Sequence, residues 1–305
     1  DLAKGLSFYA RAMEADPTYD LGLRNGANAL VNLGRAAEAE AIIDRAVQAQ
    51  PEVADLHHIR GNILAAQQRY PEAIDAYSKA IQLDPAHADA WYNRGVLRRR
   101  TKDFDAAWAD QAEVLKLRGY YRDAVYEQAM NRIFQQRWRE AAITLEPILV
   151  QDENDLEALL TRAKALGDSP PDDPWERSEL DLTTILQRDP KHVDAYRTRG
   201  LTRFRRENWR GAIEDWQKYF ELNPEAVDRW MIEDSLGTAY LNMRQYESAL
   251  EHYAASISLQ PRGTNLTNRA NALLQKGDLD GALRDCEAAL ELEANNPRAL
   301  GLRGQ

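Results

Sequence analysis

The side chains best suited to chemistry in this sequence are the adjacent histidines His57 and His58. Successive residues of a helix point about 100° apart, so these two imidazoles are poorly placed to bind one metal ion. The sequence contains no Gly-rich phosphate loop, no His-Glu-x-x-His motif and no Gly-x-Ser-x-Gly motif, each of which would indicate a known type of catalytic site. We therefore expect a chain that is not an enzyme, with no catalytic residue, no metal site and no cofactor.

The single cysteine and the recurring carboxylates have structural interpretations. Cys286 stands where equivalent parts of the chain have Tyr77, Trp216 and Tyr253, which predicts a small buried side chain and not a reactive thiol. A negative charge at the start of a helix is stabilised by the helix dipole, which explains a series of acidic residues that each stand six positions before a recurring small residue. These residues are Asp55, Asp89, Asp123, Glu157 and Asp194.

Composition excludes several classes of protein. With 305 residues, 44% hydrophobic and 29% charged, the chain has the balance of a folded protein, and its length alone would suggest about two domains. No segment approaches the ~18 to 20 apolar residues of a membrane-crossing helix, so we expect no membrane insertion. The formal net charge of −10 argues against nucleic acid as a partner, since such binders are usually basic. One cysteine excludes an intrachain disulfide framework and leaves the localisation undetermined.

An internal repeat organises the whole sequence. Small residues that we call anchors recur at spacings of 34, 34, 34, 34, 37, 37 and 33 residues, at Ala27, Gly61, Gly95, Ala129, Ala163, Gly200, Gly237 and Ala270. A second small residue follows each anchor after twelve residues, or after fifteen in the fifth unit, at Ala39, Ala73, Ala107, Ala141, Ser178, Ala212, Ala249 and Ala282. Most units close with a proline. This regularity predicts a chain built from repeated structural units.

Each unit is predicted to form two helices. In residues 73–81 the apolar side chains fall at spacings of three and four, which places them on one helix face. Asp84-Pro85 then ends the helix, because proline lacks an N–H and disfavours helical geometry in the residue before it. Alternating β-branched runs and Asn-Gly hairpins are missing from the sequence, so no strands are expected.

Segments 91–95 (WYNRG) and 70–85 (YPEAIDAYSKAIQLDP) resemble the helix-turn-helix signature of the tetratricopeptide repeat family, and the resemblance covers almost the whole chain. It implies an all-α, right-handed superhelical α-solenoid with first helices lining a concave groove. We expect one solenoid domain over residues 1–305, as part of a longer protein because it begins at Asp1 without a methionine. The predicted full units are 18–51, 52–85, 86–119, 120–153, 154–190, 191–224, 225–261 and 262–294, with partial units at 1–17 and 295–305.

Three departures from the repeat are expected to alter the solenoid locally. Pro147 falls inside a second helix and should kink it unless it lies at a helix end. Three extra residues enter the turn at 167–174, and three more enter around 226–232. These two insertions have two interpretations: drift of exposed turns, or a change of pitch that shapes the groove.

The groove is the expected binding surface, for a protein or peptide ligand. Positions three before, one after and four or five after each anchor should share its inward face. With neighbouring asparagines, they give the candidate peptide-binding residues Arg24, Asn28, His58, Asn62, Tyr92, Asn93, Arg99, Tyr126, Met130, Phe134, Arg197, Phe204, Arg205 and Asn271. The same geometry adds Asn32, Arg100, Ile133, Leu160, Lys164, Leu201, Asp234, Thr238, Asn242, Thr267 and Gln275.

Amides in this groove could hold the backbone of an extended peptide irrespective of its sequence. Six asparagines resemble the asparagine ladder of the O-GlcNAc transferase repeat domain, although the series is interrupted from about residue 123 to 242. They are Asn25, Asn28, Asn62, Asn93, Asn268 and Asn271. Helix-surface asparagines without a ligand are the alternative interpretation. The dicarboxylate clamp of chaperone-cofactor repeats does not match, because Asp123 and Glu127 stand where that family has basic residues.

The middle of the chain is more apolar. Met130, Ile133 and Phe134, at helical spacing, form either core between repeats or an exposed hot spot for an apolar anchor of a partner. In the second case Arg99, Arg100 and Arg205 would be available to pair with ligand carboxylates. Arginine outnumbers lysine 31 to 8 in the chain, however, so compositional bias accounts for part of these clusters.

The preferred hypothesis is a non-catalytic scaffold for protein–protein interaction that binds a peptide or protein segment in its concave groove. One alternative is the substrate-recruiting arm of a larger enzyme such as a glycosyltransferase. Another is a periplasmic or envelope scaffold for assembly or polysaccharide export. Exposed apolar ends of the solenoid would also favour end-to-end self-association of this chain.

Overall fold

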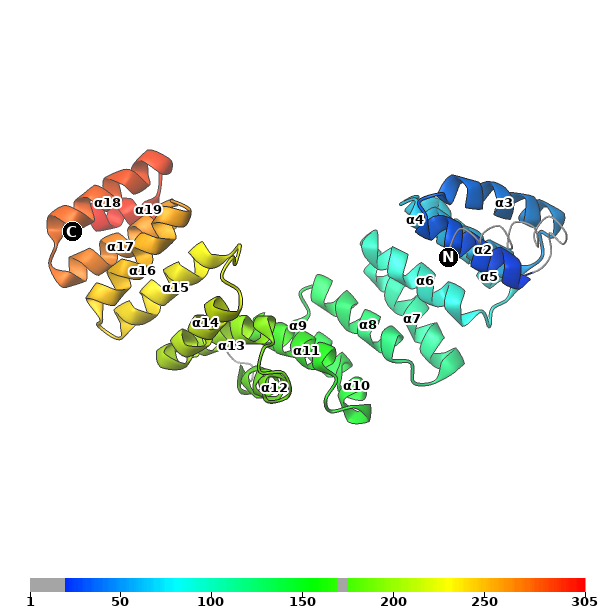
Figure 1. Cartoon of the computed structure of the whole chain (residues 1–305), viewed down its shortest axis with the longest axis horizontal. Coiled ribbons are helices and arrows are strands. Elements are labelled where there is room, and N and C mark those ends of the chain that lie inside the picture. Colours follow the sequence, from blue (N-terminus) through cyan, green and yellow to red (C-terminus); the bar gives the residue numbers. More distant parts are fainter. Residues whose placement is uncertain (1–19, 169–174, 305) are drawn as a thin grey trace. The chain divides into compact units, whose positions relative to one another are not determined.

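The computed structural model describes residues 20–168 and 175–304, and all regular structure in these ranges is helical (Figure 1). The partial unit at 1–17 and most of the 167–174 insertion lie outside the described residues. None of the described helices combines the length and the apolar character that crossing a membrane requires. These findings confirm the predicted all-α fold, and the pairing of consecutive helices described below confirms its construction from helix-turn-helix repeats.

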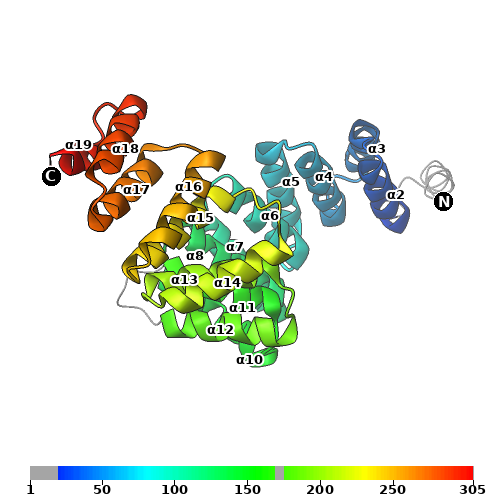
Figure 2. The same cartoon turned by 60° about the vertical axis from the view of Figure 1, so that its left-hand side comes forward.

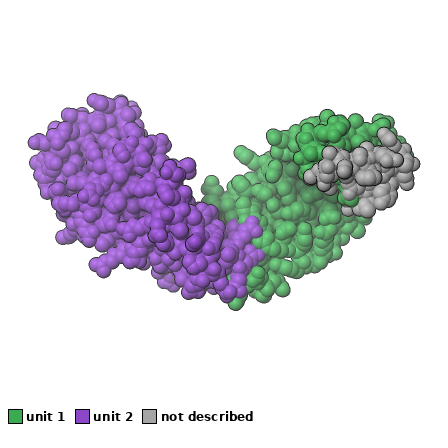
Figure 3. Space-filling view, viewed as in Figure 1, with its two compact units in different colours: residues 1–153 green, residues 154–305 purple. Residues whose placement is uncertain are grey.

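The chain divides into two compact units, residues 1–153 and residues 154–305 (Figure 3). The helices of unit 1 are α2 (Asp20–Asn32), α3 (Ala36–Ala49), α4 (Ala54–Ala66), α5 (Tyr70–Leu83), α6 (Ala88–Arg100), α7 (Phe104–Arg118), α8 (Arg122–Phe134), α9 (Trp138–Thr144) and α10 (Glu146–Gln151). Those of unit 2 are α11 (Leu156–Asp168), α12 (Trp175–Arg188), α13 (Val193–Arg205), α14 (Trp209–Leu222), α15 (Arg229–Asn242), α16 (Tyr246–Leu259), α17 (Gly263–Lys276), α18 (Leu279–Leu292) and α19 (Pro297–Arg303). One solenoid domain over residues 1–305 stays a prediction.

Within each unit, consecutive helices pack side by side as pairs. In unit 1, α4 lies against α5 and α6 against α7, and in unit 2, α15 lies against α16 and α17 against α18 (Figures 1 and 2). The second helix of one pair also contacts the first helix of the next, as α5 does with α6. Each predicted repeat between residues 18 and 294 therefore contains one first helix and one second helix, the latter divided in two in the fourth repeat.

The recurring small residues form the tightest part of this packing. All eight anchors are buried, and all eight second small residues are at most 2% exposed. Because a small side chain lets two helix axes approach closely, larger neighbours can fill the space beside it at the density of a protein interior. The largest of these neighbours are the fully buried Trp216 and Tyr253.

The turn between the two helices of a pair has the same backbone form in each repeat where it is described. The residue seven positions after the anchor has a positive φ, with values of 58° to 93°, at Gly34, Gln68, Lys102, Gln136, Glu207, Arg244 and Gly277. Residues other than glycine rarely adopt this left-handed region. Five of the seven turns therefore carry local backbone strain that helix pairing must offset.

Pro147 has the effect that its position predicts. The second helix of the fourth repeat is divided into α9 and α10, and Pro147 stands in the first turn of α10. A proline there needs no N–H donor within the helix. Leu145, at the junction of the two segments, is fully buried, so the break leaves the core of this repeat filled.

Candidate binding surfaces

Three of the predicted groove residues come together where α4 meets α6 in unit 1. Asn93 Nδ2 lies 3.0 Å from His58 Nε2 and donates a hydrogen bond to Asn62 Oδ1, also at 3.0 Å. The Tyr77 hydroxyl donates to the same Asn62 oxygen at 2.7 Å. These contacts hold the amides in fixed orientations across the boundary between two repeats. Arg24 and Asn28 lie on α2, but their side chains are outside the described part of the structure.

The candidates at the other end of unit 1 form an aromatic and cationic cluster. Phe134 stacks on Phe104 with ring centroids 6.2 Å apart, and the Arg99 guanidinium lies 5.4 Å from the Phe134 ring centroid. Phe134 is 54% exposed, so this ring is not core between repeats. Tyr126 and Met130 are half-buried beside it in the same helix.

Tyr92 lies edge-on to Tyr121, with ring centroids 5.8 Å apart. Burial raises the pKa of Tyr92 to about 12, and the Glu127 carboxylate contributes in the same direction. The phenol therefore remains protonated at neutral pH. It can donate a hydrogen bond and carries no charge.

Three of the four arginines among the candidate peptide-binding residues, Arg24 excepted, have acidic partners within the chain. Arg99 Nε donates to Glu127 at 2.7 Å, Arg197 pairs with Asp228, and Arg205 bonds to the Gly167 carbonyl and to Asp168. For Arg99 and Arg205, which the sequence suggested as partners of ligand carboxylates, these internal bonds compete with a ligand. A ligand would have to displace an internal carboxylate, which removes most of the gain in free energy.

A repeated buried ion pair is the feature that sequence reasoning missed. Arg162 and Asp181, both 3% exposed, form two hydrogen bonds of 2.8 Å each. The arginine stands directly before an anchor, and the aspartate lies on the following second helix. The same pairing recurs at Arg94–Asp110, Arg199–Asp215 and Arg269–Asp285. The spacing of sixteen residues, or nineteen in the longer fifth repeat, was the signal in the sequence. These four arginines therefore have a structural role.

A hollow of about 640 Å³ in unit 2 gathers several of the predicted groove positions. Its walls come from the end of α13 and from α15, α16, α17 and α19. The predicted residues in these walls are Phe204, Asp234, Thr238, Asn242, Asn268, Asn271 and Gln275. The structure adds Ser235, Leu241, Arg244, Tyr253 and Arg298. Thr267, which was expected to face the groove, is instead 1% exposed and donates to the Thr264 carbonyl.

Asp234 is the acidic centre of this hollow. Asn268 Nδ2 lies 2.8 Å and 3.1 Å from its two carboxylate oxygens. Burial raises the pKa of Asp234 above its ordinary value, although the Asn268 hydrogen bond and the charge of Arg298 act in the opposite direction. One turn after Asp234 on α15, the Thr238 hydroxyl lies 3.1 Å from the Tyr253 hydroxyl of α16. The surface therefore offers amides, hydroxyls and one carboxylate within a single concavity.

Comparison with known families and proteins finds one recurring similarity. Models described as TPR repeat or tetratricopeptide repeat match residues 61–100, 171–237 and 235–299. Among curated proteins, the DnaJ homolog subfamily C member 7 homolog of Dictyostelium discoideum is 25% identical over 138 residues, which is 41% of this chain and 26% of that protein. Sperm-associated antigen 1 of Rattus norvegicus is 46% identical over 55 residues, 18% of this chain and 6% of that protein. The chain thus spans about a quarter or less of the length of these relatives.

Solved structures show the same architecture. The C-terminal part of a TPR repeat-containing protein from Cytophaga hutchinsonii aligns with a TM-score of 0.61 at 15% identity, covering 77% of this chain and 94% of that one. YrrB, described as a TPR protein with an unusual peptide-binding site, aligns with a TM-score of 0.52 at 20% identity, covering 67% and 97% of the two chains. At these identities the likeness concerns the fold alone.

Proposed function

The chain belongs to the tetratricopeptide repeat family, whose repeats form scaffolds for protein–protein interaction, and from this premise we propose that it is a non-catalytic scaffold that binds an extended peptide segment in the hollow of unit 2. The observation that carries the proposal is the convergence of Asn242, Asn268, Asn271 and Gln275 on one concave surface.

The chemistry of the hollow suits the main chain of a peptide. A primary amide offers two donors and one acceptor, so a set of them can match the alternating N–H and C=O groups of an extended backbone without reading its side chains. Phe204 and Leu241 add apolar surface at the same place, which favours a ligand that has hydrophobic side chains between polar ones. The pairing of Asn268 with Asp234 fixes one amide before the ligand arrives and reduces the entropy lost on binding.

A displayed library of random peptides, selected on the intact chain, tests this proposal. Peptides that bind should lose at least tenfold in affinity to an Asn242→Ala/Asn271→Ala variant, since interface hot spots contribute about 1 to 2 kcal/mol each. Gln82→Ala/Gln187→Ala is the matched control, because both amides are exposed on second helices and neither lines the hollow. If the selected peptides bind the Asn242→Ala/Asn271→Ala variant with the same affinity as they bind the control variant and the unmodified chain, the hollow is excluded as the binding site.

Unit 1 offers a second surface for the same kind of contact. The exposed Phe134 ring, backed by Phe104 and Arg99, could take an apolar anchor of a larger partner. A Tyr126→Ala/Phe134→Ala variant that keeps its helical circular dichroism should weaken such a partner and leave peptides bound in the hollow of unit 2 unaffected. Unchanged binding of every selected ligand would rule out this surface.

A further inference from the structure

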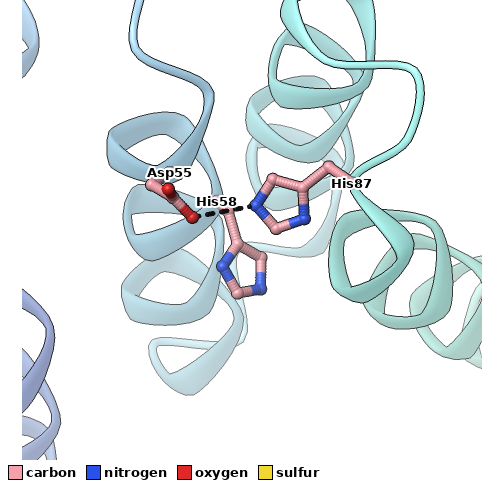
Figure 4. Close-up of side chains that lie close together, drawn as sticks. All are labelled: Asp55, His58 and His87. Carbon is pink, nitrogen blue, oxygen red and sulfur yellow. Dashed lines mark hydrogen bonds and ion pairs between the residues drawn. The ribbon is translucent and has the colours of Figure 1, made fainter.

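Two histidines and one aspartate from neighbouring repeats form a cluster in unit 1. Asp55 and His58 stand three residues apart on α4, and His87 stands directly before α6 (Figure 4). Each offers one ligand atom, and these atoms lie within 4.8 Å of one another. The ring centroids of His58 and His87 are also 4.8 Å apart. Sequence reasoning considered only the adjacent His57 and His58, but His57 Nε2 instead lies 2.8 Å from the Pro51 carbonyl.

We propose that Asp55, His58 and His87 form a site for a divalent zinc ion that links the second repeat to the third. Imidazole nitrogen and carboxylate oxygen are ordinary zinc ligands, with bonds of about 2.0 to 2.2 Å. In a tetrahedral site two such ligand atoms are about 3.3 Å apart. Asp55 Oδ1 and His87 Nε2 already have a separation of 3.2 Å.

The remaining adjustment is small. The His58 ligand atom lies no more than 4.8 Å from the other two, so bringing all three to zinc requires shifts of about 1 to 1.5 Å, given the bond lengths of such sites. The Asp55 side chain is 44% exposed and can turn toward the ion, whereas the two histidines are held on buried surfaces. Exposure on the Asp55 side also gives the ion a path from solvent. A set of three protein ligands leaves a fourth position for water.

The residues around the cluster orient the two rings. Asn93 Nδ2 lies 3.0 Å from His58 Nε2, and the backbone N–H of Ala90 donates to His87 Nδ1 at 3.2 Å. In the zinc-free protein these two donors hold the rings in their orientations. In the zinc-free protein, acceptance at Nδ1 places the His87 proton on Nε2, from which it is donated to Asp55. Coordination through Nε2 moves that proton to Nδ1 and gives up the bond from Ala90, so we expect weaker binding than in a closed four-ligand site.

The chain contains its own control for this site. His192 caps α13 as His87 caps α6, through a hydrogen bond from Ala195 N–H to Nδ1, also at 3.2 Å. Both histidines follow an Asp-Pro pair by two residues. In the repeat before His192, the position equivalent to His58 is Leu160, so the second imidazole of the proposed zinc site is missing beside His192. Within residues 20–168 and 175–304, the cluster at His87 is the only such group of three or more potential ligands.

The experiment is a calorimetric titration of the chelator-treated full chain with zinc chloride alone. We expect one zinc ion per chain. His87→Asn should weaken binding at least tenfold, because loss even of an outer partner costs about 10- to 100-fold in affinity. Asparagine is a strong N-cap residue, so this variant keeps the start of α6. His192→Asn makes the same substitution in unit 2 and should leave zinc binding unchanged.

A second variant protects the test from a folding defect. Asp55→Asn removes a partly exposed carboxylate without changing the size of the side chain, and it too should weaken zinc binding at least tenfold. If circular dichroism shows that His87→Asn is unfolded, the Asp55→Asn result decides. The proposal is overturned if the intact chain binds no zinc up to a concentration of about 0.1 mM, a weak limit for a three-ligand site. It is also overturned if the folded Asp55 and His87 variants bind as well as the unmodified chain, or if His192→Asn causes the same loss.

Discussion

Gly61 lies directly against the ring of Tyr77. A Cβ atom placed on Gly61 would come within 2.5 Å of Tyr77 Cε1, which is closer than any real contact. The two residues are an anchor and the residue sixteen positions later on the second helix. Three of the four glycine anchors face an aromatic ring at this position, in the pairs Gly61–Tyr77, Gly200–Trp216 and Gly237–Tyr253, and the fourth, Gly95, faces Gln111. Alanine anchors correspond to aliphatic residues or cysteine, in the pairs Ala27–Ile43, Ala129–Leu145, Ala163–Leu182 and Ala270–Cys286. The largest side chains therefore stand opposite anchors that have no Cβ atom.

The close contact between Gly61 and Tyr77 predicts compensation between two substitutions. Gly61→Ala should lower the free energy of unfolding by about 1 to 3 kcal/mol, because the added methyl group overlaps the Tyr77 ring. Tyr77→Leu should cost about 1 to 3 kcal/mol through lost contacts and the lost hydrogen bond to Asn62. The double variant should cost less than the sum of the two by at least about 0.5 kcal/mol. Urea denaturation of the four proteins measures this coupling.

Gly301→Ala is the control for this cycle, since a Cβ atom at Gly301 has no neighbour within 4 Å and alanine favours the helix. Its free energy of unfolding should be unchanged or higher. Strict additivity of the Gly61 and Tyr77 substitutions would show that the two volumes are not coupled.

The left-handed backbone in the turn between paired helices predicts that Gly277→Ala and Lys102→Gly change the free energy of unfolding in opposite directions. Gly277 has φ of 93°, and the equivalent Lys102 has φ of 67°. Gly277→Ala should lower the free energy of unfolding by about 1 kcal/mol, because a Cβ atom is strained in this region. Lys102→Gly should relieve the same strain and raise the free energy of unfolding. The increase should be small, because glycine has greater conformational freedom in the unfolded chain. Thermal unfolding of both variants is the measurement, and an equal shift of both in one direction would contradict the interpretation.

The sequence predicted the repeat and its helices because these depend on local patterns. Anchors such as Gly61 and Ala270 recur at near-constant spacing, and a periodic apolar face is sufficient to define a helix. The partners of individual side chains were less accessible. Arg99 was expected to face a ligand but bonds to Glu127 of the next repeat, since a long side chain can reach several neighbours. Thr267 was placed in the groove although it is buried, because an error of one position rotates a side chain by about 100°.

The cluster at His87 shows the same limit at longer range. His58 and His87 are 29 residues apart in the sequence, and only the stacking of one repeat on the next brings them together. Adjacent histidines attract notice in a sequence, whereas a pair separated by almost one repeat length does not. The recurrence of Arg and Asp at a separation of sixteen residues, or nineteen in the fifth repeat, was visible in principle. Its four instances become meaningful only when the two helices of each repeat are seen to face each other.

For the buried pair of Arg162 and Asp181, we expect removal of one partner to lower the free energy of unfolding much more than replacement of both. Arg162→Met should cost about 3 to 5 kcal/mol, because it leaves the Asp181 carboxylate buried without its main partner. An Arg162→Met/Asp181→Leu variant should be much closer to the unmodified chain, since a hydrophobic pair of similar volume avoids the desolvation of both charges. Chemical denaturation distinguishes the two, and equal losses in both variants would contradict this account of the pair.

Asp234 predicts a pH-dependent stability in unit 2. Burial raises its pKa in the folded chain, against the effects of Asn268 and Arg298, so the folded state binds the proton more tightly than the unfolded state. The favourable contribution of the protonated form is therefore complete below the unfolded pKa of about 3.9 and is lost as pH rises through the higher folded value. Asp234→Asn, which carries no charge at any pH, should be more stable than the unmodified chain at pH 7, and this advantage should shrink as the pH falls toward 4. Urea denaturation of both proteins at several pH values measures the difference. A difference between Asp234→Asn and the unmodified chain that stays constant with pH would show that the Asp234 carboxyl group titrates alike in both states.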